Sequence, residues 1–295
     1  MTFPAVPEDV VAEIYVKTAA TGVTAWTDIT GDIRVSDRIS VTYGFSSLTR
    51  SSTPPPAACQ FVVDNRSGNY RPRNPLGAYY GSLGQNTPIR VASRVARDFF
   101  TRTTSNGWGT ATTGQAWTAV GTASQFATTG SAGTLSFTAA SQTLLAYQGS
   151  QLFRDIDVSA SFTFPFADVT GGTVACGVVL NGISTTDYFV ARLNITAAEA
   201  MTLDIVHVTA STADTVVTGV AVSSFAYTGQ QIRIKAQLSG QTLRAKVWPA
   251  ASPEPFAWLV EGSYAEGATE GTPCKVLAIK LEQRWACRKR LVTNW

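Results

Sequence analysis

The stretch that decides the fold of the first third of the chain is Cys59-Gln-Phe-Val-Val-Asp-Asn-Arg-Ser-Gly-Asn-Tyr-Arg-Pro-Arg-Asn-Pro-Leu-Gly-Ala-Tyr-Tyr-Gly-Ser-Leu-Gly-Gln-Asn-Thr-Pro-Ile-Arg-Val91. Its two ends, from Cys59 and from Pro88, are β-branched and aromatic runs that are typical of strands. Between them lie glycines that tolerate unusual backbone angles and prolines that fix them: Gly68, Gly77, Gly81, Gly84, Pro72, Pro75 and Pro88. The stretch therefore predicts a loop of defined shape between two strands.

The residues before this loop also predict strands. Residues 11–17 and 25–29 are separated by a Thr/Gly turn, which is the spacing of a hairpin. Residues 32–43 alternate between apolar and polar side chains and predict two strands or one bulged strand. The run Pro54-Pro-Pro must end any strand, because proline has no N–H to donate to a neighbour.

Three motifs in this region occur in a fixed order: Asp64-Asn-Arg-Ser-Gly-Asn-Tyr-Arg-Pro-Arg-Asn-Pro, Tyr79-Tyr-Gly and Gly84-Gln-Asn-Thr-Pro-Ile-Arg-Val. With most of residues 10–95, they resemble the N-terminal domain of minor tail proteins of phages that infect actinobacteria. The resemblance implies that residues 1–95 form a β-barrel like those of distal tail and baseplate hub proteins. It also implies a virion protein of the tail tip, made in the bacterial cytoplasm, that forms a trimeric or hexameric ring. The implied neighbours are the tail tube, hub and tape measure proteins.

The loop itself is a candidate subunit contact. It is rich in arginine and tyrosine, which are enriched at the energetic centres of protein interfaces. The residues expected at a subunit or ring interface are Arg66, Tyr70, Arg71, Arg73, Tyr79 and Tyr80.

From residue 98 to about residue 265 the sequence predicts a separate β-sandwich. The boundary lies between residues 92 and 98, where the composition becomes rich in Thr, Ser and Gly. Ile156, Val158, Ala160, Phe162 and Phe164 alternate with polar residues, and strand-like runs recur about every ten residues. Residues 98–126 and 231–258 are similar to concanavalin-like (laminin-G-like) jelly-roll domains of the same tail proteins. The expected fold class is thus all-β, with a hub-like barrel followed by a jelly-roll.

Residues 266–295 allow two interpretations. Val276 to Leu281 could form a closing strand, or residues 277–290 could form an amphipathic helix. The helix would place Lys280, Arg284 and Arg288 in one row of like charge, which is unfavourable. A strand followed by a basic docking tail is therefore expected, with residues 284–295 dispensable for folding.

Composition excludes several classes of function. The net charge of +3 arises from a basic cluster at residues 275–290, so no nucleic-acid-binding surface is expected. No run of about 18 apolar residues predicts a membrane span, and no signal peptide is visible at the N-terminus. Cys59 and Cys176 are expected to be buried apolar residues. The one histidine, His207, and the scattered cysteines predict no metal site, and no cofactor is expected.

The carbohydrate-related hypotheses concern residues 98–265. The carboxylates there show no recognisable catalytic spacing, and His207 is expected to be an ordinary strand residue, so an enzyme is not expected. Large aromatic side chains could instead stack on a host cell-wall glycan. Trp108, which lies between two glycines, is expected to be exposed, and Tyr188 is a second candidate; Trp117 and Trp248 are expected in the core. The alternative function is a cell-wall polysaccharide hydrolase.

Overall fold

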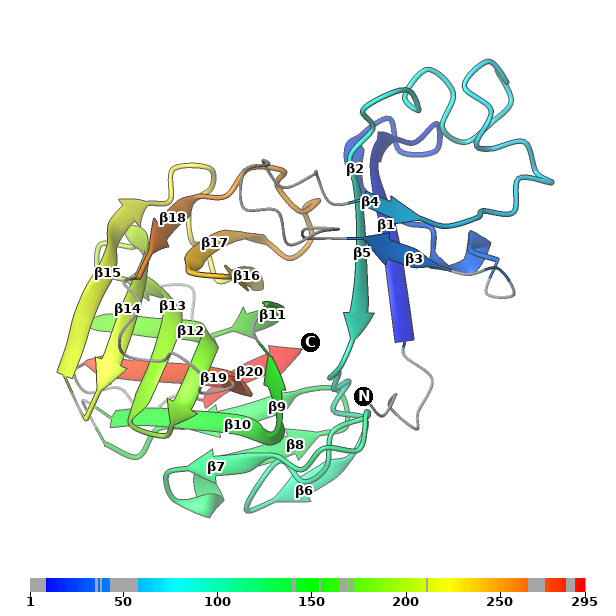
Figure 1. The fold of residues 1–295 in the computed structure, drawn as a ribbon. Coiled ribbons are helices and arrows are strands. Elements are labelled where there is room, and N and C mark those ends of the chain that lie inside the picture. The colour runs from blue at the N-terminus through cyan, green and yellow to red at the C-terminus, as the bar shows by residue number, and fades with distance from the viewer. Residues whose placement is uncertain are drawn as a thin grey trace, which may run out of the picture. The chain divides into compact units, whose positions relative to one another are not determined.

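The computed structural model describes residues 9–34, 37, 39–42, 58–139, 142–153, 155–164, 169, 172–210, 212–264, 274–284 and 290–294. The chain divides into two compact units, Met1–Val95 and Ala96–Trp295. Both units are built from strands, and the only helical segments among the described residues are two short 3-10 turns, η1 (Thr30–Asp32) and η2 (Ala123–Gln125) (Figure 1).

The first unit contains two small antiparallel sheets within its described residues. One sheet has the order β2 (Thr24–Asp28), β1 (Asp9–Lys17) and β5 (Ile89–Arg94), and the other pairs β3 (Ser40–Thr42) with β4 (Ala58–Gln60). The predicted hairpin is confirmed, because β1 and β2 pair from Glu13–Asp28 to Lys17–Thr24. A closed barrel is not present among the described residues of this unit.

The core of the first unit follows from the two-residue period of β1. Ala12, Ile14 and Val16 all point to one face and are buried. They pack with Ile29, Ile33 and Tyr79, so this core is shared between the strands and the long loop that follows β4.

The second unit is a β-sandwich of two antiparallel sheets. Within the described ranges, one sheet has seven strands in the order β15 (Thr212–Ala221), β14 (Met201–Thr209), β13 (Asp187–Ile195), β12 (Thr173–Ser184), β19 (Cys274–Arg284), β10 (Gln142–Phe153) and β7 (Thr118–Val120). The other has eight described strands in the order β18 (Val260–Ser263), β17 (Thr242–Pro249), β16 (Ile232–Ser239), β11 (Ile156–Thr163), β20 (Arg290–Asn294), β9 (Gly133–Ser136), β8 (Phe126–Thr129) and β6 (Thr103–Ser105). The prediction of an all-β sandwich is confirmed.

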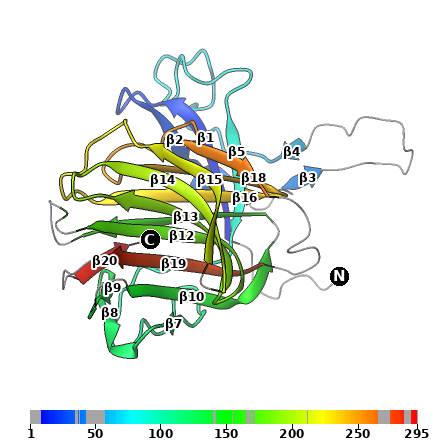
Figure 2. The same ribbon diagram turned by 90° about the vertical axis from the view of Figure 1, so that its left-hand side faces the viewer.

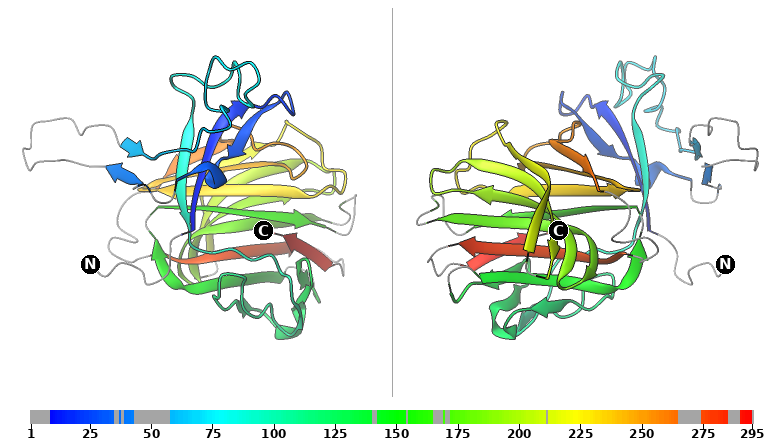
Figure 3. Two further views of the ribbon diagram at one scale, coloured as in Figure 1. Left: turned by 90° about the vertical axis from the view of Figure 1, so that its right-hand side faces the viewer. Right: turned by 60° about the vertical axis from the view of Figure 1, so that its left-hand side comes forward.

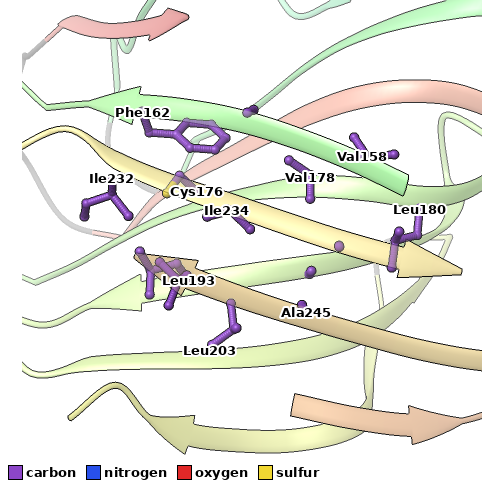
Figure 4. Close-up of a cluster of buried hydrophobic side chains, with 14 of the residues drawn as sticks. Val158, Phe162, Cys176, Val178, Leu180, Leu193, Leu203, Ile232, Ile234 and Ala245 are labelled. Atoms are coloured by element: carbon purple, nitrogen blue, oxygen red, sulfur yellow. The ribbon is translucent and has the colours of Figure 1, made fainter. Parts of the chain in front are cut away.

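Alternating apolar residues from both sheets fill the space between them. Val158 and Phe162 of β11 and Ile234 of β16 meet Val178 and Leu180 of β12 in one buried cluster (Figure 4). The predicted alternation of β11 is confirmed, since Ile156, Val158, Ala160 and Phe162 are all buried. Burial of one such aliphatic or aromatic side chain contributes about 1.5–3 kcal/mol, which makes this cluster the main source of stability for the unit.

The described C-terminal residues, 274–284 and 290–294, form interior strands of the two sheets. β19 pairs with β12 on one side and β10 on the other, and it is drawn in red between two green strands in Figures 2 and 3. β20 lies in the other sheet, between β11 and β9. The strand expected at Val276–Leu281 is confirmed and the helical alternative is wrong. The prediction of a free basic tail is also wrong for residues 290–294, because their backbone pairs with β11 on one side and β9 on the other.

Candidate functional site

The loop between β4 and β5 is a series of linked turns. The N–H groups of Gly68, Arg71, Asn74, Gly77 and Tyr80 each donate to the carbonyl three residues earlier, at 2.9–3.3 Å. Gly68 has a φ of +75°, which favours glycine. A Cβ at Gly77 would lie only 3.1–3.4 Å from the carbonyl oxygens of Gly68, Asn69 and Asn74, so this position has little space for a side chain.

Three asparagine side chains hold these turns together. Asn65 Oδ1 accepts a hydrogen bond from the N–H of Tyr70 at 2.9 Å, and Asn69 Oδ1 accepts from the N–H of Ala78 at 3.1 Å. The Asn74 side chain donates to the carbonyl of Gly68 at 3.0 Å and accepts from the N–H of Leu76 at 3.2 Å. Side chains of this length readily bond nearby backbone groups, which explains why a loop without regular secondary structure has a defined shape.

Tyr70 fixes the loop to the rest of the first unit. Its hydroxyl donates to Asp32 Oδ2 at 2.6 Å, and its ring packs against that of Tyr79 at a centroid distance of 5.3 Å. Burial, followed by the hydrogen bond to Asp32, raises the pKa of Tyr70 well above its usual range. Burial likewise raises the pKa of Tyr79. Both tyrosines therefore stabilise the loop from the inside.

The structure separates the six predicted interface residues into two groups. Tyr79 is only 7% exposed and Tyr70 is half-buried, so the prediction that Tyr79 is a surface contact is wrong, and Tyr70 has a structural role. Tyr80, Arg71 and Arg73 are exposed. The Arg66 side chain is exposed as well, and it forms an ion pair with Asp64. Whether any of them contacts a neighbouring subunit stays a prediction.

Leu76 is the residue that the sequence-based prediction missed. Its side chain is 92% exposed, the highest value among the large exposed hydrophobic residues of the described chain. It lies in the same series of turns as Arg71 and Arg73. The sequence Asn74-Pro-Leu-Gly77 could have indicated this exposure. A leucine flanked by turn-forming residues does not belong to a strand, so no strand alternation directs its side chain toward a core. We call Arg71, Arg73, Leu76 and Tyr80 the loop surface.

Loss of the Tyr70 hydroxyl should loosen this loop. We expect Tyr70→Phe to lower the melting temperature of the first unit by several degrees, because a hydrogen bond to a charged acceptor contributes about 1.5 kcal/mol. Tyr80→Phe is the matched control, since Tyr80 is 53% exposed. Equal melting temperatures for the two variants, measured by calorimetry, would show that the Asp32 contact does not hold the loop.

Trp108, the first glycan candidate, is not on the surface. Its side chain is 1% exposed and its indole N–H donates to the carbonyl of Thr134 at 3.1 Å, so the expectation of exposure is wrong. The rings of Phe100, Trp117 and Phe126 surround it at centroid distances of 5.0–6.0 Å. Trp117 and Trp248 are buried as expected.

Tyr188, the second glycan candidate, is 4% exposed. It belongs to a second buried cluster with Leu145, Val179, Val190 and Val206. Since Phe189 and Ala191 of the same strand belong to the main core, this second cluster lies on the opposite face of the seven-stranded sheet. Neither predicted aromatic residue offers an accessible ring to a ligand.

A buried charge network supports the tryptophan cluster. The Asp98 carboxylate accepts hydrogen bonds from both terminal nitrogens of Arg102 at 2.8–2.9 Å, from the Trp117 indole at 2.6 Å and from the Phe100 N–H at 3.0 Å. Burial alone would raise the pKa of the Asp98 carboxyl, but these hydrogen bonds together hold it below its usual value. All of these hydrogen bonds join groups within the second unit, so we assign the network a structural role.

The other side chains considered as reactive groups are His207, Cys176 and Cys59. His207 lies in β14 with Nε2 2.8 Å from Asp187 Oδ1, and its ring stacks on Phe189 at 4.2 Å. Cys176 is buried, which raises the pKa of its thiol, whereas Cys59 is exposed and the prediction that it is buried is wrong. No group of three or more potential metal ligands occurs within the described ranges.

No helix in the described part of the chain is long and apolar enough to cross a membrane.

The comparisons with known proteins give only distant likenesses. No protein-family model and no curated protein matches the chain. Among solved structures, a carbohydrate-binding module from Bacillus subtilis is 10% identical, with 60% of this chain and 91% of the module covered at a TM-score of 0.40. A β-glucanase from Bacillus licheniformis is 9% identical, with 61% and 89% covered at 0.41. An uncharacterized protein from Mycobacterium paratuberculosis is 8% identical, with 68% and 97% covered at 0.44. At these values no function is transferred to the chain.

Proposed function

We propose that this protein is a structural component of a phage tail tip. The first unit joins a trimeric or hexameric ring and contacts other tail proteins through the loop surface. The second unit is an accessory domain that attaches to host cell-surface glycan without cleaving it. The resemblance of residues 10–95 to minor tail proteins supports the proposed location in a phage tail, and the structure of the loop supports the assembly role.

The observation that carries the proposal is the exposure of Leu76 on a loop held by hydrogen-bonded turns. Leu76 is 92% exposed and contributes little to the core of the first unit, while a series of turns and three asparagines hold its loop in place. Two arginines and a tyrosine lie in the same series of turns, and these residue types dominate the centres of interfaces. A preorganised surface of this kind lowers the entropic cost of association.

The test is a double variant of the loop surface, Leu76→Ala with Arg73→Ala. We expect a melting temperature within about 2 °C of the wild type, since surface substitutions rarely change stability by more than about 0.5 kcal/mol. Incorporation into assembled tails, measured by immunoblotting of purified particles, should fall at least tenfold. Val23→Ala, which removes a 47% exposed valine elsewhere in the first unit, is the control and should assemble normally.

Normal assembly of the double variant would contradict the role of the loop.

Incubation with purified host envelope polysaccharide tests the second unit separately. Retention without new reducing ends supports binding, whereas released reducing ends would favour the alternative, a cell-wall polysaccharide hydrolase.

A further inference from the structure

A row of polar side chains crosses four strands on the outer face of the eight-stranded sheet. Gln237 of β16 donates to Asp157 Oδ1 of β11 at 2.5 Å and accepts from Arg244 Nε of β17 at 2.6 Å. Arg244 also lies 3.9 Å from Glu261 Oε2 of β18. We call Asp157, Gln237, Arg244 and Glu261 the outer row. Their strand neighbours, such as Ala236 and Ala245, belong to the core, so the outer row faces away from it.

The loop between β17 and β18 is fixed beside the outer row by buried charges. Glu254 Oε1 lies 2.8 Å from Lys246 Nζ and 3.4 Å from Lys235 Nζ, and Lys246 also donates to the carbonyl of Pro255 at 2.5 Å. The side chain of Lys246 is 3% exposed and that of Lys235 is 11% exposed. Because a buried ammonium is costly without its partners, these bonds hold residues 254–255 tightly on the sheet.

Two aromatic residues of this loop lie close to the outer row. Trp258 is half-buried, with Arg244 Cζ 5.1 Å and Lys246 Nζ 4.6 Å from its ring centre. Both cations project from the same face of β17, so the indole of Trp258 is held against the same end of the sheet as the outer row. Phe256, on the same loop, is 53% exposed.

Charge and dimensions indicate what this surface can bind. Four cations, Arg233, Lys235, Arg244 and Lys246, lie among three carboxylates, Asp157, Glu254 and Glu261, and the net charge of +1 is too small to favour a polyanion such as nucleic acid. The outer row alternates hydrogen-bond acceptors and donors over three strand spacings, roughly 14 Å in length. Planar polar groups of this kind suit the hydroxyls of a neutral sugar chain, and aromatic rings suit its C–H faces.

We propose that the outer row, together with Phe256 and Trp258, is a binding surface for a neutral polysaccharide whose chain lies across β11, β16, β17 and β18. This proposal rests on the proposed function of the second unit in glycan attachment. It places the contact on the eight-stranded sheet, away from both Trp108 and Tyr188.

The proposal is tested by affinity electrophoresis of the full chain in gels that contain a soluble glucan, mannan, galactan or arabinan, with heparin as a polyanionic probe. At least one neutral polymer should retard the wild type. Phe256→Ala and Gln237→Ala, which change half-exposed or exposed side chains, should each weaken that retardation at least fivefold, and Trp258→Ala should abolish it. Phe99→Ala is the control, because it removes a 41% exposed ring elsewhere in the same unit.

The outcomes separate the two proposals. If a neutral polymer retards the wild type and the Phe256 and Gln237 variants equally, this surface is not the site, although glycan attachment stands. If no neutral polymer retards the wild type, or if heparin alone does so, both the surface and the proposed attachment are wrong. Should Trp258→Ala fail to fold, as judged by circular dichroism, the Phe256 and Gln237 variants still decide the result.

Discussion

A chain that ends at residue 273 fails to form the second unit. This truncation removes β19 and β20, which are interior strands of the two sheets. Without β19, the edges of β12 and β10 lose their hydrogen-bonded partner, and without β20 the edges of β11 and β9 do. Each sheet is then divided in two, and the buried backbone groups of four strands lack partners. We expect the calorimetric transition of the second unit to disappear and its near-ultraviolet circular dichroism to be lost.

A shorter truncation sharpens this test. Removal of residues 284–295 deletes β20 but keeps most of β19, and it should also abolish the cooperative transition, because β20 alone joins β11 to β9. The sequence-based interpretation of these residues as a docking tail predicts the reverse, namely normal folding and weaker assembly. A cooperative transition in the shorter truncation would support the interpretation as a docking tail and contradict the strand pairing of β20.

The sequence was sufficient where the structure depends on local patterns. Alternation in residues 155–164 predicted β11 and its buried face, and the Thr/Gly turn predicted the β1–β2 hairpin. The density of Gly, Pro and Asn in residues 64–88 predicted a loop of defined shape, and its turns and asparagine bonds are now visible. These features are set by neighbours within a few residues, so one sequence contains them.

The sequence was insufficient where the structure depends on distant pairing. β19 lies between strands that begin at Gln142 and Thr173, more than a hundred residues earlier, and composition gives no sign of that position. Trp108 was misjudged for a related reason. Gly107 and Gly109, with φ of +134° and +70°, suggested an exposed turn, but the indole they flank is buried and donates to Thr134. Flanking glycines indicate backbone freedom and say nothing about which way the side chain points.

The binding surface proposed for the second unit was also missed, because its residues are distant in sequence and of types common on any strand. Asp157, Gln237, Arg244 and Glu261 come from strands spread over a hundred residues, and they become neighbours only through the strand order of the sheet. Their residue types resemble those of any solvated strand face. The signal that was available was local, in Glu254-Pro-Phe-Ala-Trp258, where two aromatic residues interrupt a turn-rich loop.

Replacement of Asp98 should have the largest effect of any single substitution in the second unit. The Asp98 side chain is fully buried, and Asp98→Ala leaves the Arg102 guanidinium and the Trp117 indole without their shared acceptor. Removal of one partner from a buried ion pair costs about 3–5 kcal/mol. We expect a fall of about 10 °C or more in the melting temperature of this unit, with loss of near-ultraviolet signal from the tryptophan cluster. Asp214→Ala, at an exposed position of β15, is the control and should change stability little.

The same carboxylate should make the second unit sensitive to acid. Because the pKa of Asp98 is lower in the folded protein than in the unfolded chain, its contribution is fully present above the unfolded value of about 3.9. As the pH falls below that value and through the folded pKa, the unfolded chain takes up the proton more readily, and the contribution is lost. The wild type should therefore lose stability between about pH 5 and pH 2, whereas Asp98→Ala, which is already destabilised, should show a smaller further loss over the same range. Parallel pH profiles for the two proteins, measured by chemical denaturation, would show that Asp98 does not link folding to protonation in this way.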